Sequence, residues 1–363
     1  MLTKPYLYAL SLAGAMIAGL TASTMRGQEV VVGINLVDPY SMNSQAQDAM
    51  LNSLHSAGVH VIRASITPND AGVEFAERAW SHGIKIEWLI YRFGGYEPGG
   101  SPLSAADPAA FRETYAPVLA KLEAKGIKLV ALELGNELNL SGYNSDFPKR
   151  PAGMQFGARD MESNAEARQV AKGLLQYLKV LAVLKEMRDS SRLNRNTPIL
   201  TAGFSTLEKD DGPRPGATTD LISTNATLDF LRAHGVDKLV DAYGVHVYPS
   251  GEKPGNPAAE AERTRGLAKY VLDKCRPAGS TDGKPCWITE WGFNNASKSC
   301  PINDDSRAVL AKGMMDSLRP YVKEGRLSGV IYYCWNTVSL YAVYRCGSET
   351  KAGKVAVDEA LLR

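Results

Sequence analysis

The chain alternates helix-like and strand-like segments along most of its length, and this alternation restricts the possible folds more than any other feature. Helix-like segments end in a glycine and a β-branched or aromatic run follows at once, as at Gly58, Gly83, Gly126 and Gly235. Glycine readily adopts the left-handed conformation that closes a helix, so each of these glycines marks a tight helix-to-strand corner. The pattern therefore indicates successive strand–helix units.

Eight segments have the composition of buried strands, because they are apolar on both faces, as parallel strands covered by helices must be. They are Val30–Leu36, Val59–Ile66, Ile84–Tyr91, Leu129–Glu137, Pro198–Phe204, Val240–Pro249, Pro285–Gly292 and Gly329–Asn336. Eight strand–helix repeats predict an α/β protein with a closed (β/α)8 (TIM) barrel as a single catalytic domain. The competing fold is an open doubly wound sheet, but no strand is followed by a G-x-G-x-x-G or P-loop sequence.

The predicted connections differ in length. Helix-to-strand corners are short, whereas several strand-to-helix loops are long: Arg92–Ala106, Ser141–Glu162, Ser205–Asn225, Ser250–Glu260 and Phe293–Asp304. In a barrel these loops all rise from the C-terminal face, where active sites lie. Loops of this length are often functional, so we expect them to form walls around a groove for an extended substrate.

The N-terminal residues have the pattern of a secretory signal. Lys4 is followed by an apolar run from Tyr6 to Leu20 and by small side chains at Thr21 and Ser23. The apolar run is shorter than the ~20 residues of a spanning helix. We therefore expect residues 1–23 to be removed, residues 28–363 to form the catalytic domain, and the protein to be secreted or periplasmic without a membrane anchor.

The charge balance and the cysteine content limit which binding partners and which cellular compartment we expect for this protein. The chain has 41 basic and 39 acidic side chains, a balance that argues against nucleic-acid binding. Its five cysteines leave at least one outside any intrachain pair, and none has the spacing of a zinc site. In an oxidising compartment Cys275 can pair with Cys286 and Cys300 with Cys346, while Cys334 is expected to be a buried thiol. The sequence leaves this pairing open.

Two predicted strands carry a glutamate at or near their C-terminal end, Glu137 and Glu290. A carboxylate at the end of a buried strand is costly unless it is paired, hydrogen-bonded or used. Two such groups facing one cavity can divide into an acid and a base, as glycoside hydrolysis requires. One protonates the leaving oxygen and the other attacks the anomeric carbon, with a separation of about 5–5.5 Å in retaining enzymes. The alternative is two rim glutamates in salt bridges, with Arg63 as a possible partner.

The two motifs together resemble a known group. Gly135-Asn136-Glu137 after an apolar strand, with Thr289-Glu290-Trp291-Gly292 on a later one, is similar to the clan of retaining (β/α)8 glycoside hydrolases that have a strand-four acid/base and a strand-seven nucleophile. The string from Glu133 to Asn139 resembles the E-I-G-N-E-P-N sequence of heparanase-like, arabinofuranosidase-like and xylosidase-like members, with Leu138 in place of proline. The motif match covers only a few strand ends.

The resemblance implies roles for individual residues. Glu137 would be the acid/base and Glu290 the nucleophile, Asn136 would bind the sugar 2-hydroxyl, and Arg63 would lie beside the nucleophile and keep it ionised.

Further binding residues are expected on strands six and eight. His246 and Tyr248 share a face and would contact the nucleophile and the sugar, and Trp335 would stack on a sugar ring. Ordinary core packing is the alternative for His246 and Trp335, and an ion pair for Arg63. Glu133 is expected to be a buried structural group, and Trp291 to pack toward the helices.

The predicted function is a secreted retaining glycoside hydrolase that cleaves β-linked oligo- or polysaccharide, with no cofactor and no metal. Two alternatives remain: a non-catalytic carbohydrate-binding barrel, and a metal-dependent isomerase or phosphodiesterase using Glu137, Glu290 and His246. No Asp cluster or H-x-H pair favours the metal site. The sugar, endo or exo action, hydrolysis or transglycosylation, and the oligomeric state stay open.

Overall fold

The computed structural model describes residues 30–148, 153–206, 212–213, 219–248, 257–297, 299–336 and 339–363. Nine strands form the central parallel sheet: β1 (Val31–Asn35), β2 (Val61–Ser65), β3 (Lys85–Ile90), β4 (Ala131–Leu134), β6 (Ile199–Leu200), β7 (Phe204–Thr206), β10 (Tyr243–Val247), β11 (Cys286–Trp291) and β12 (Leu327–Tyr332). Their order is β6-β4-β3-β2-β1-β12-β11-β10-β7. All eight predicted strand segments are confirmed.

The sheet closes on itself because its two ends, β6 and β7, are pieces of one strand. Only residues 201–203 separate them. Single bridges complete the ring at this gap: Asn136 pairs with Gly203, and Leu200 with Ala242. Eight strand positions therefore form the predicted (β/α)8 barrel.

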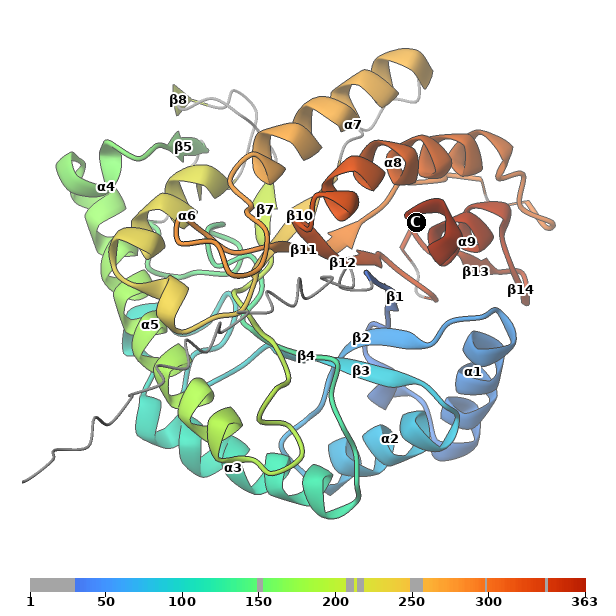
Figure 1. Cartoon of the computed structure of the whole chain (residues 1–363), viewed down its shortest axis with the longest axis horizontal. Coiled ribbons are helices and arrows are strands. Elements are labelled where there is room, and N and C mark those ends of the chain that lie inside the picture. Colours follow the sequence, from blue (N-terminus) through green and yellow to red (C-terminus); the bar gives the residue numbers. More distant parts are fainter. Residues whose placement is uncertain are drawn as a thin grey trace, which may run out of the picture.

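Helices surround the strands, as Figure 1 shows in a view along the barrel. They are α1 (Ser44–Ser56), α2 (Asp70–Ser81), α3 (Pro108–Ala124), α4 (Asp160–Ser163), α5 (Ala165–Ser190), α6 (Thr224–Ala233), α7 (Pro257–Leu272), α8 (Asp305–Lys323) and α9 (Lys351–Ala356). Short 3-10 turns cover Pro39–Ser41, Leu103–Ala105, Val236–Lys238 and Glu359–Leu361. The predicted start at Asp107 is confirmed, since its side chain accepts a hydrogen bond from the Ala109 N–H at 2.8 Å.

The barrel has two apolar layers. A large cluster fills the space between strands and helices. A small cluster fills the barrel interior with Val61, Ala131, Leu200, Ala242, Trp287 and Ile331. Gly329 makes room for the largest of these, because a Cβ there would lie 2.1 Å from the Trp287 ring. The barrel is thus packed at this level, and the polar groups of the site lie in another layer.

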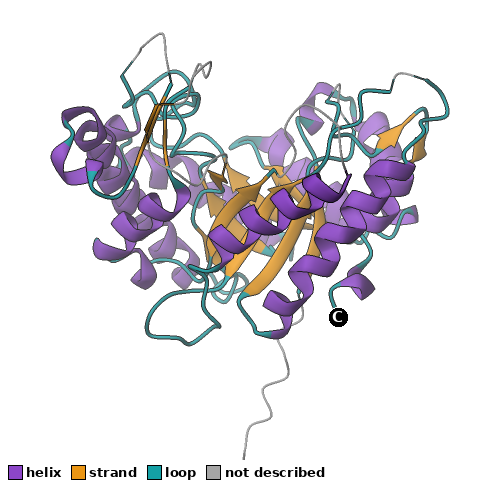
Figure 2. Ribbon diagram, turned by 90° about the horizontal axis from the view of Figure 1, so that it is seen from above, coloured by secondary structure: helices purple, strands orange, loops and turns teal. Residues whose placement is uncertain are grey.

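Loops carry short strands of their own, which Figure 2 shows outside the central sheet. β5 (Met154–Phe156) pairs with β8 (Gly212–Pro213) and β9 (Leu221–Ile222), so the loops after β4 and β7 are joined. β13 (Tyr344–Arg345) and β14 (Ser348–Glu349) form a hairpin after β12. Asn139 ties the first two loops together, with its Nδ2 donating to the Ser205 and Ile222 carbonyls at 3.0 and 2.8 Å.

Two disulfides confirm the pairs proposed from sequence. Cys275 is bonded to Cys286, and Cys300 to Cys346, while Cys334 is buried and belongs to neither bond. The predicted signal segment, residues 1–23, and most of the predicted loop Ser250–Glu260 lie outside the described residues. None of the helices in the described part of the chain combines the length and the apolar composition that a membrane crossing requires.

Candidate active site

Arg63 on β2 is the centre of a buried polar layer at the C-terminal ends of the strands. Parallel register places Asn35 beside it on β1 and Glu87 beside it on β3. Its Nε donates to Glu133 Oε2 at 2.5 Å, and its Nη1 donates to Asn35 Oδ1 at 2.8 Å and to Glu290 Oε1 at 2.6 Å. Burial disfavours its charge, but the carboxylates of Glu133 and Glu290 outweigh burial and raise the pKa of Arg63. Arg63 is therefore a fixed cation beside Glu290.

Glu290 on β11 receives bonds from two directions. Besides Arg63, the Tyr248 hydroxyl donates to its Oε2 at 2.5 Å. Burial alone would raise the pKa of Glu290, but the charges of His246 and Arg63 and the hydrogen bonds from Tyr248 and Arg63 lower it below the ordinary value. Glu290 is thus held as a carboxylate, the state that a nucleophile requires.

Glu137 follows β4 in an irregular turn. The regular strand ends at Leu134, three residues before the predicted end. Gly135 then has φ 85° and Glu137 has φ 47°, both in the left-handed region. The Glu137 N–H donates to the Gly203 carbonyl at 3.0 Å, which anchors this turn to the gap between β6 and β7. A left-handed glutamate is costly and requires such support from its neighbours.

His246 brings the two carboxylates together. Its Nδ1 lies 2.9 Å from Glu137 Oε1 and 3.6 Å from Glu290 Oε2. These two oxygens are therefore at most about 6.5 Å apart, the sum of the two distances. This bound is compatible with the carboxylate spacing of about 5–5.5 Å in retaining glycosidases. His246 is fully buried, and the absence of a side chain at Gly203 admits its ring.

The structure brings six of the seven predicted site residues into one contact network. Asn136 joins through its Oδ1, which accepts from Arg63 Nη2 at 2.9 Å. The six residues are Arg63, Asn136, Glu137, His246, Tyr248 and Glu290. They come from four strand positions of the barrel, β2, β4, β10 and β11, and meet at the end where the long loops begin.

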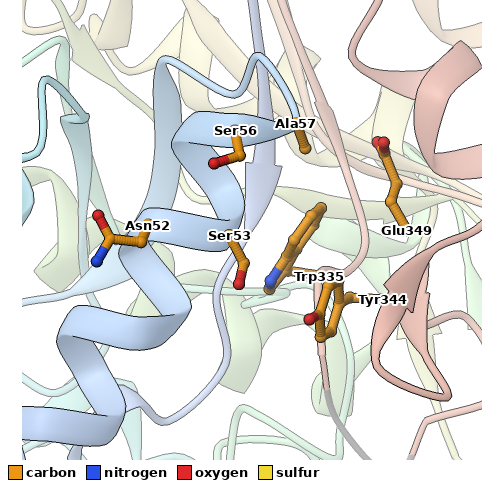
Figure 3. Close-up of a pocket in the computed structure, with 7 residues that line it drawn as sticks. All are labelled: Asn52, Ser53, Ser56, Ala57, Trp335, Tyr344 and Glu349. Atoms are coloured by element: carbon orange, nitrogen blue, oxygen red, sulfur yellow. The ribbon is translucent and has the colours of Figure 1, made fainter.

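Trp335 does not join this network. β12 ends at Tyr332, so the alternation of side chains along a strand no longer places a residue three positions later. The Trp335 indole stacks on Tyr344 with ring centroids 4.9 Å apart. It lies between α1 and the β13–β14 hairpin, as Figure 3 shows. We therefore correct its predicted placement at the sugar.

Several tyrosines near the carboxylates were not predicted. Tyr333 lies with its ring 6.1 Å from that of Tyr248, and Tyr341 is 5.3 Å from Tyr248. Tyr91 and Tyr143 contact each other edge-to-face. Burial and the negative charge of Glu137 raise the pKa of both Tyr91 and Tyr143. Two pairs of half-buried tyrosines, Tyr91 with Tyr143 and Tyr333 with Tyr341, thus flank the two carboxylates. Tyr91 and Tyr333 directly follow β3 and β12, so the strand pattern of the sequence could have predicted that they lie near the site. Tyr143 and Tyr341 lie in loops, for which the sequence has no such pattern.

Two further glutamates lie deeper. Glu133 is fully buried and accepts from Thr289 Oγ1 at 2.9 Å as well as from Arg63, as predicted for a structural group. Glu87 is also fully buried, with one oxygen 4.0 Å from Arg63 Nε. Burial and the charge of Glu133 raise the pKa of Glu87 well above its ordinary value. Trp291 packs edge-to-face on Tyr332 in the core, as predicted.

The described residues contain no group of three or more His, Cys, Asp or Glu side chains arranged to hold a metal ion.

Comparisons with known proteins support the fold assignment. No protein-family model matches the chain, and no curated protein matches it. Similar solved structures include a family 5 xyloglucanase from Paenibacillus pabuli, with a TM-score of 0.54 and 14% identity over 93% of this chain and 99% of that one. The catalytic domain of GH30 xylanase C from Talaromyces cellulolyticus gives 0.52 and 13% over 93% and 77%. A fungal β-1,4-galactanase structure gives 0.51 and 15% over 90% and 93%. At these identities the likeness establishes the barrel fold.

Proposed function

We propose that this protein is a retaining glycoside hydrolase acting on a β-linked oligo- or polysaccharide. The observation that carries the proposal is the pair Glu137 and Glu290, held on either side of one His246 nitrogen in unequal surroundings. Glu290 is kept ionised by Arg63 and Tyr248. Glu137 contacts His246 and neither of these two groups in the hydrogen bonds of the described residues. Such a difference divides two carboxylates into a nucleophile and an acid.

The reaction has two displacements. First the Glu290 carboxylate attacks the anomeric carbon, the bond to the leaving oxygen breaks, and protonated Glu137 gives its proton to that oxygen. A water molecule then attacks the same carbon, the ionised Glu137 takes its proton, and the bond to Glu290 breaks. Each step inverts the anomeric centre, so the product keeps the β configuration. The Arg63 charge and the Tyr248 hydroxyl stabilise Glu290 when it leaves as a carboxylate.

The aromatic groups around the pair fit a carbohydrate. Tyrosine offers both a flat apolar face for a sugar ring and a hydroxyl for its hydrogen bonds. Tyr91, Tyr143, Tyr248, Tyr333 and Tyr341 supply such faces near the carboxylates. The solved structures of similar fold are named as xyloglucanase, xylanase and β-1,4-galactanase, which supports a glycan substrate.

The test is release of reducing ends from xyloglucan, xylan, β-1,4-galactan and cello-oligosaccharides. We expect Glu290→Gln to lower the rate at least about a thousandfold, because the neutral amide cannot form the glycosyl ester. The fold should persist, since Arg63 keeps Glu133 as a partner. Glu74→Gln, at an exposed position of α2, is the matched control and should retain full activity.

Two results would contradict the proposal. Near-wild-type turnover by Glu290→Gln would remove Glu290 from the mechanism. Saturable glycan binding without any product from the wild-type protein, over this panel and an extended set of glycans, would favour the non-catalytic barrel instead.

We also propose that the chain is exported and cleaved near Ser23. The N-terminal pattern and the two disulfides fit an oxidising compartment outside the cytosol. Mass spectrometry of the protein secreted by its host should find a chain that begins within a few residues of position 24. An intact N-terminus on the cellular protein would contradict this.

A further inference from the structure

Tyr91 and Tyr143 form a pair beside the proposed acid/base Glu137. Tyr91 directly follows β3, and β3 pairs in parallel with β4. The carbonyl of Ile90, the residue before Tyr91, accepts a hydrogen bond from the Gly135 N–H at 2.9 Å. Tyr91 is therefore anchored next to the turn that carries Glu137.

Tyr143 is held near Glu137 by two successive backbone turns. The Leu140 N–H donates to the Glu137 carbonyl at 2.9 Å, and the Tyr143 N–H donates to the Leu140 carbonyl at 3.0 Å. The Tyr96 hydroxyl donates to the Tyr143 carbonyl and adds a third support. The rings of Tyr91 and Tyr143 contact each other edge-to-face, with centroids 6.4 Å apart. The pair thus has a fixed position on the Glu137 side of the site.

Both side chains of this pair keep surface that a ligand can reach. Each is half-buried. Neither hydroxyl has a hydrogen-bond partner within the described part of the chain, and neither oxygen is among the buried polar atoms left without a partner. The two hydroxyls are therefore open to solvent. A tyrosine in this state offers its ring to the apolar face of a sugar and its hydroxyl to the hydroxyls of that sugar.

The other tyrosines of the site lie at the other carboxylate. The Tyr248 hydroxyl donates to Glu290, and the rings of Tyr333 and Tyr341 lie 6.1 and 5.3 Å from the Tyr248 ring. The strand before Glu137 is β4, and the strand before Tyr333 and Tyr341 is β12. These two strands are four positions apart in a ring of eight, so they lie opposite each other. One tyrosine group therefore belongs to each carboxylate.

In the proposed reaction the two carboxylates act on different parts of the substrate. Glu290 attacks the anomeric carbon of the sugar that stays on the enzyme, whereas Glu137 protonates the oxygen of the saccharide that departs. We propose that Tyr91 and Tyr143 form the binding site for this departing saccharide. By microscopic reversibility the same pair binds a saccharide that attacks the intermediate as an acceptor. The inference rests on the proposed function and adds to it the side on which the departing saccharide is held.

The experiment traps the retained sugar, so that only the departing side varies. The reagent is a 2-deoxy-2-fluoro-β-glycosyl fluoride of the sugar released in the substrate panel. Its anomeric carbon forms an ester with Glu290 as fluoride leaves. Water or a hydroxyl of added cellobiose, xylobiose or β-1,4-galactobiose then bonds to that carbon, the ester bond breaks, and the proton of the attacking group goes to Glu137. The measured quantity is the ratio of the disaccharide-dependent to the water-dependent rate of reactivation.

Matched variants test the assignment of the pair. Tyr143→Ala and Tyr91→Ala should each lower the ratio, and Tyr143→Ala at least about tenfold, as expected when an aromatic side chain no longer contacts its ligand. Tyr143→Phe keeps the ring and should lower the ratio only about threefold, as for one neutral hydrogen bond. Tyr333→Ala removes the same side chain on the Glu290 side. It should preserve the ratio, even where it slows both reactions.

The outcomes separate this inference from the proposed function. A wild-type ester that no disaccharide accelerates, or an unchanged ratio in both Tyr143→Ala and Tyr91→Ala, would overturn the inference and leave the labelled Glu290 as support for the proposed function. An equal fall of the ratio in Tyr333→Ala would also overturn it, because the pair would then have no special relation to the departing saccharide. If peptide mass spectrometry finds no ester on Glu290, the proposed function fails and the inference fails with it.

Discussion

Glu290 and Glu137 differ less in burial than in the groups that contact them. Both side chains are about one-tenth exposed. Glu290 accepts from Arg63 and Tyr248, whereas the side-chain bond of Glu137 runs to His246. A guanidinium and a phenol aimed at one carboxylate stabilise its charge, so the division of roles follows from the donors rather than from exposure.

Replacement of Tyr248 by phenylalanine tests this at the residue scale. The lost hydroxyl bond lowers the pKa of Glu290, so its removal raises that pKa. The nucleophile is then ionised only from a higher pH, and the acidic limb of the kcat/KM profile should move to higher pH. At neutral pH kcat/KM should fall by about tenfold or more, as for a lost bond to a charged group. Tyr321→Phe on α8 is the control, and an unmoved acidic limb in Tyr248→Phe would refute the assignment.

Sequence reasoning placed six of the seven predicted site residues in the network, three of them inside regular strands and three just after a strand ends, and failed for Trp335. Arg63, His246 and Glu290 lie within β2, β10 and β11, so alternation and strand position predicted that they face the interior. Trp335 lies beyond the end of β12, and its orientation depends on the hairpin that follows. The positions of Tyr143 and Tyr341 depend on loop structure, which no local periodicity encodes.

At the scale of elements, the gap in the fifth strand position is the main departure from a regular barrel. Residues 201–203 interrupt the pairing, and Gly203 both receives the Glu137 N–H and leaves room for His246. Tyr177 on α5 fills part of the gap, because its hydroxyl donates to the Leu134 carbonyl and accepts from the Ala202 N–H. The interruption thus positions groups on two neighbouring strands.

Gly203→Ala should therefore disturb the active site, although Gly203 is not one of the six residues of the network. The new Cβ would lie 2.0 Å from His246 Nε2, so the ring must move away and loosen its contacts with both glutamates. We expect kcat/KM to fall at least about tenfold and stability by about 1–3 kcal/mol, as for an overpacked core. Gly313→Ala, where a Cβ meets nothing within 4 Å, is the control. Full activity of Gly203→Ala would show that His246 is not held as described.

The eight strands were predictable because both faces of each are apolar, a pattern set within a few residues. The sequence could not show that β6 and β7 are two separate strands, because the gap between them is set by partners on or next to β4, α5 and β10. The same reason applies to the small sheet of β5, β8 and β9. Its strands have two or three residues and form through contacts between distant loops.

At the scale of the whole molecule, cross-links hold the loops on the rim. The Cys300–Cys346 bond joins the loop after β11 to the hairpin after β12. The buried Asp304–Arg307 pair adds to this connection, because Arg307 Nη1 also donates to the Ala342 carbonyl at 3.1 Å. The sequence suggested the cysteine pairs from turn positions and redox compartment but left them open, since spacing alone does not bring two loops together.

The double variant Cys300→Ala/Cys346→Ala should be less stable by about 2–5 kcal/mol, as for other lost native disulfides. Its catalytic rate at 25 °C should stay close to that of the wild type, because neither cysteine contacts the carboxylate network. Thermal unfolding with and without dithiothreitol measures the first effect. A variant with an unchanged Tm would show that this bond contributes nothing to stability.

Glu137 is proposed as the acid/base and Glu290 as the nucleophile, and azide rescue tests these two roles most directly. An activated β-glycoside of the sugar released in the substrate panel is supplied to Glu137→Ala and to Glu290→Ala with sodium azide. In Glu137→Ala, azide should attack the ester on Glu290, accelerate turnover and give a β-glycosyl azide. In Glu290→Ala, azide should displace the leaving group directly and give the α-glycosyl azide. The opposite pairing of products, or rescue of neither variant, would contradict the account.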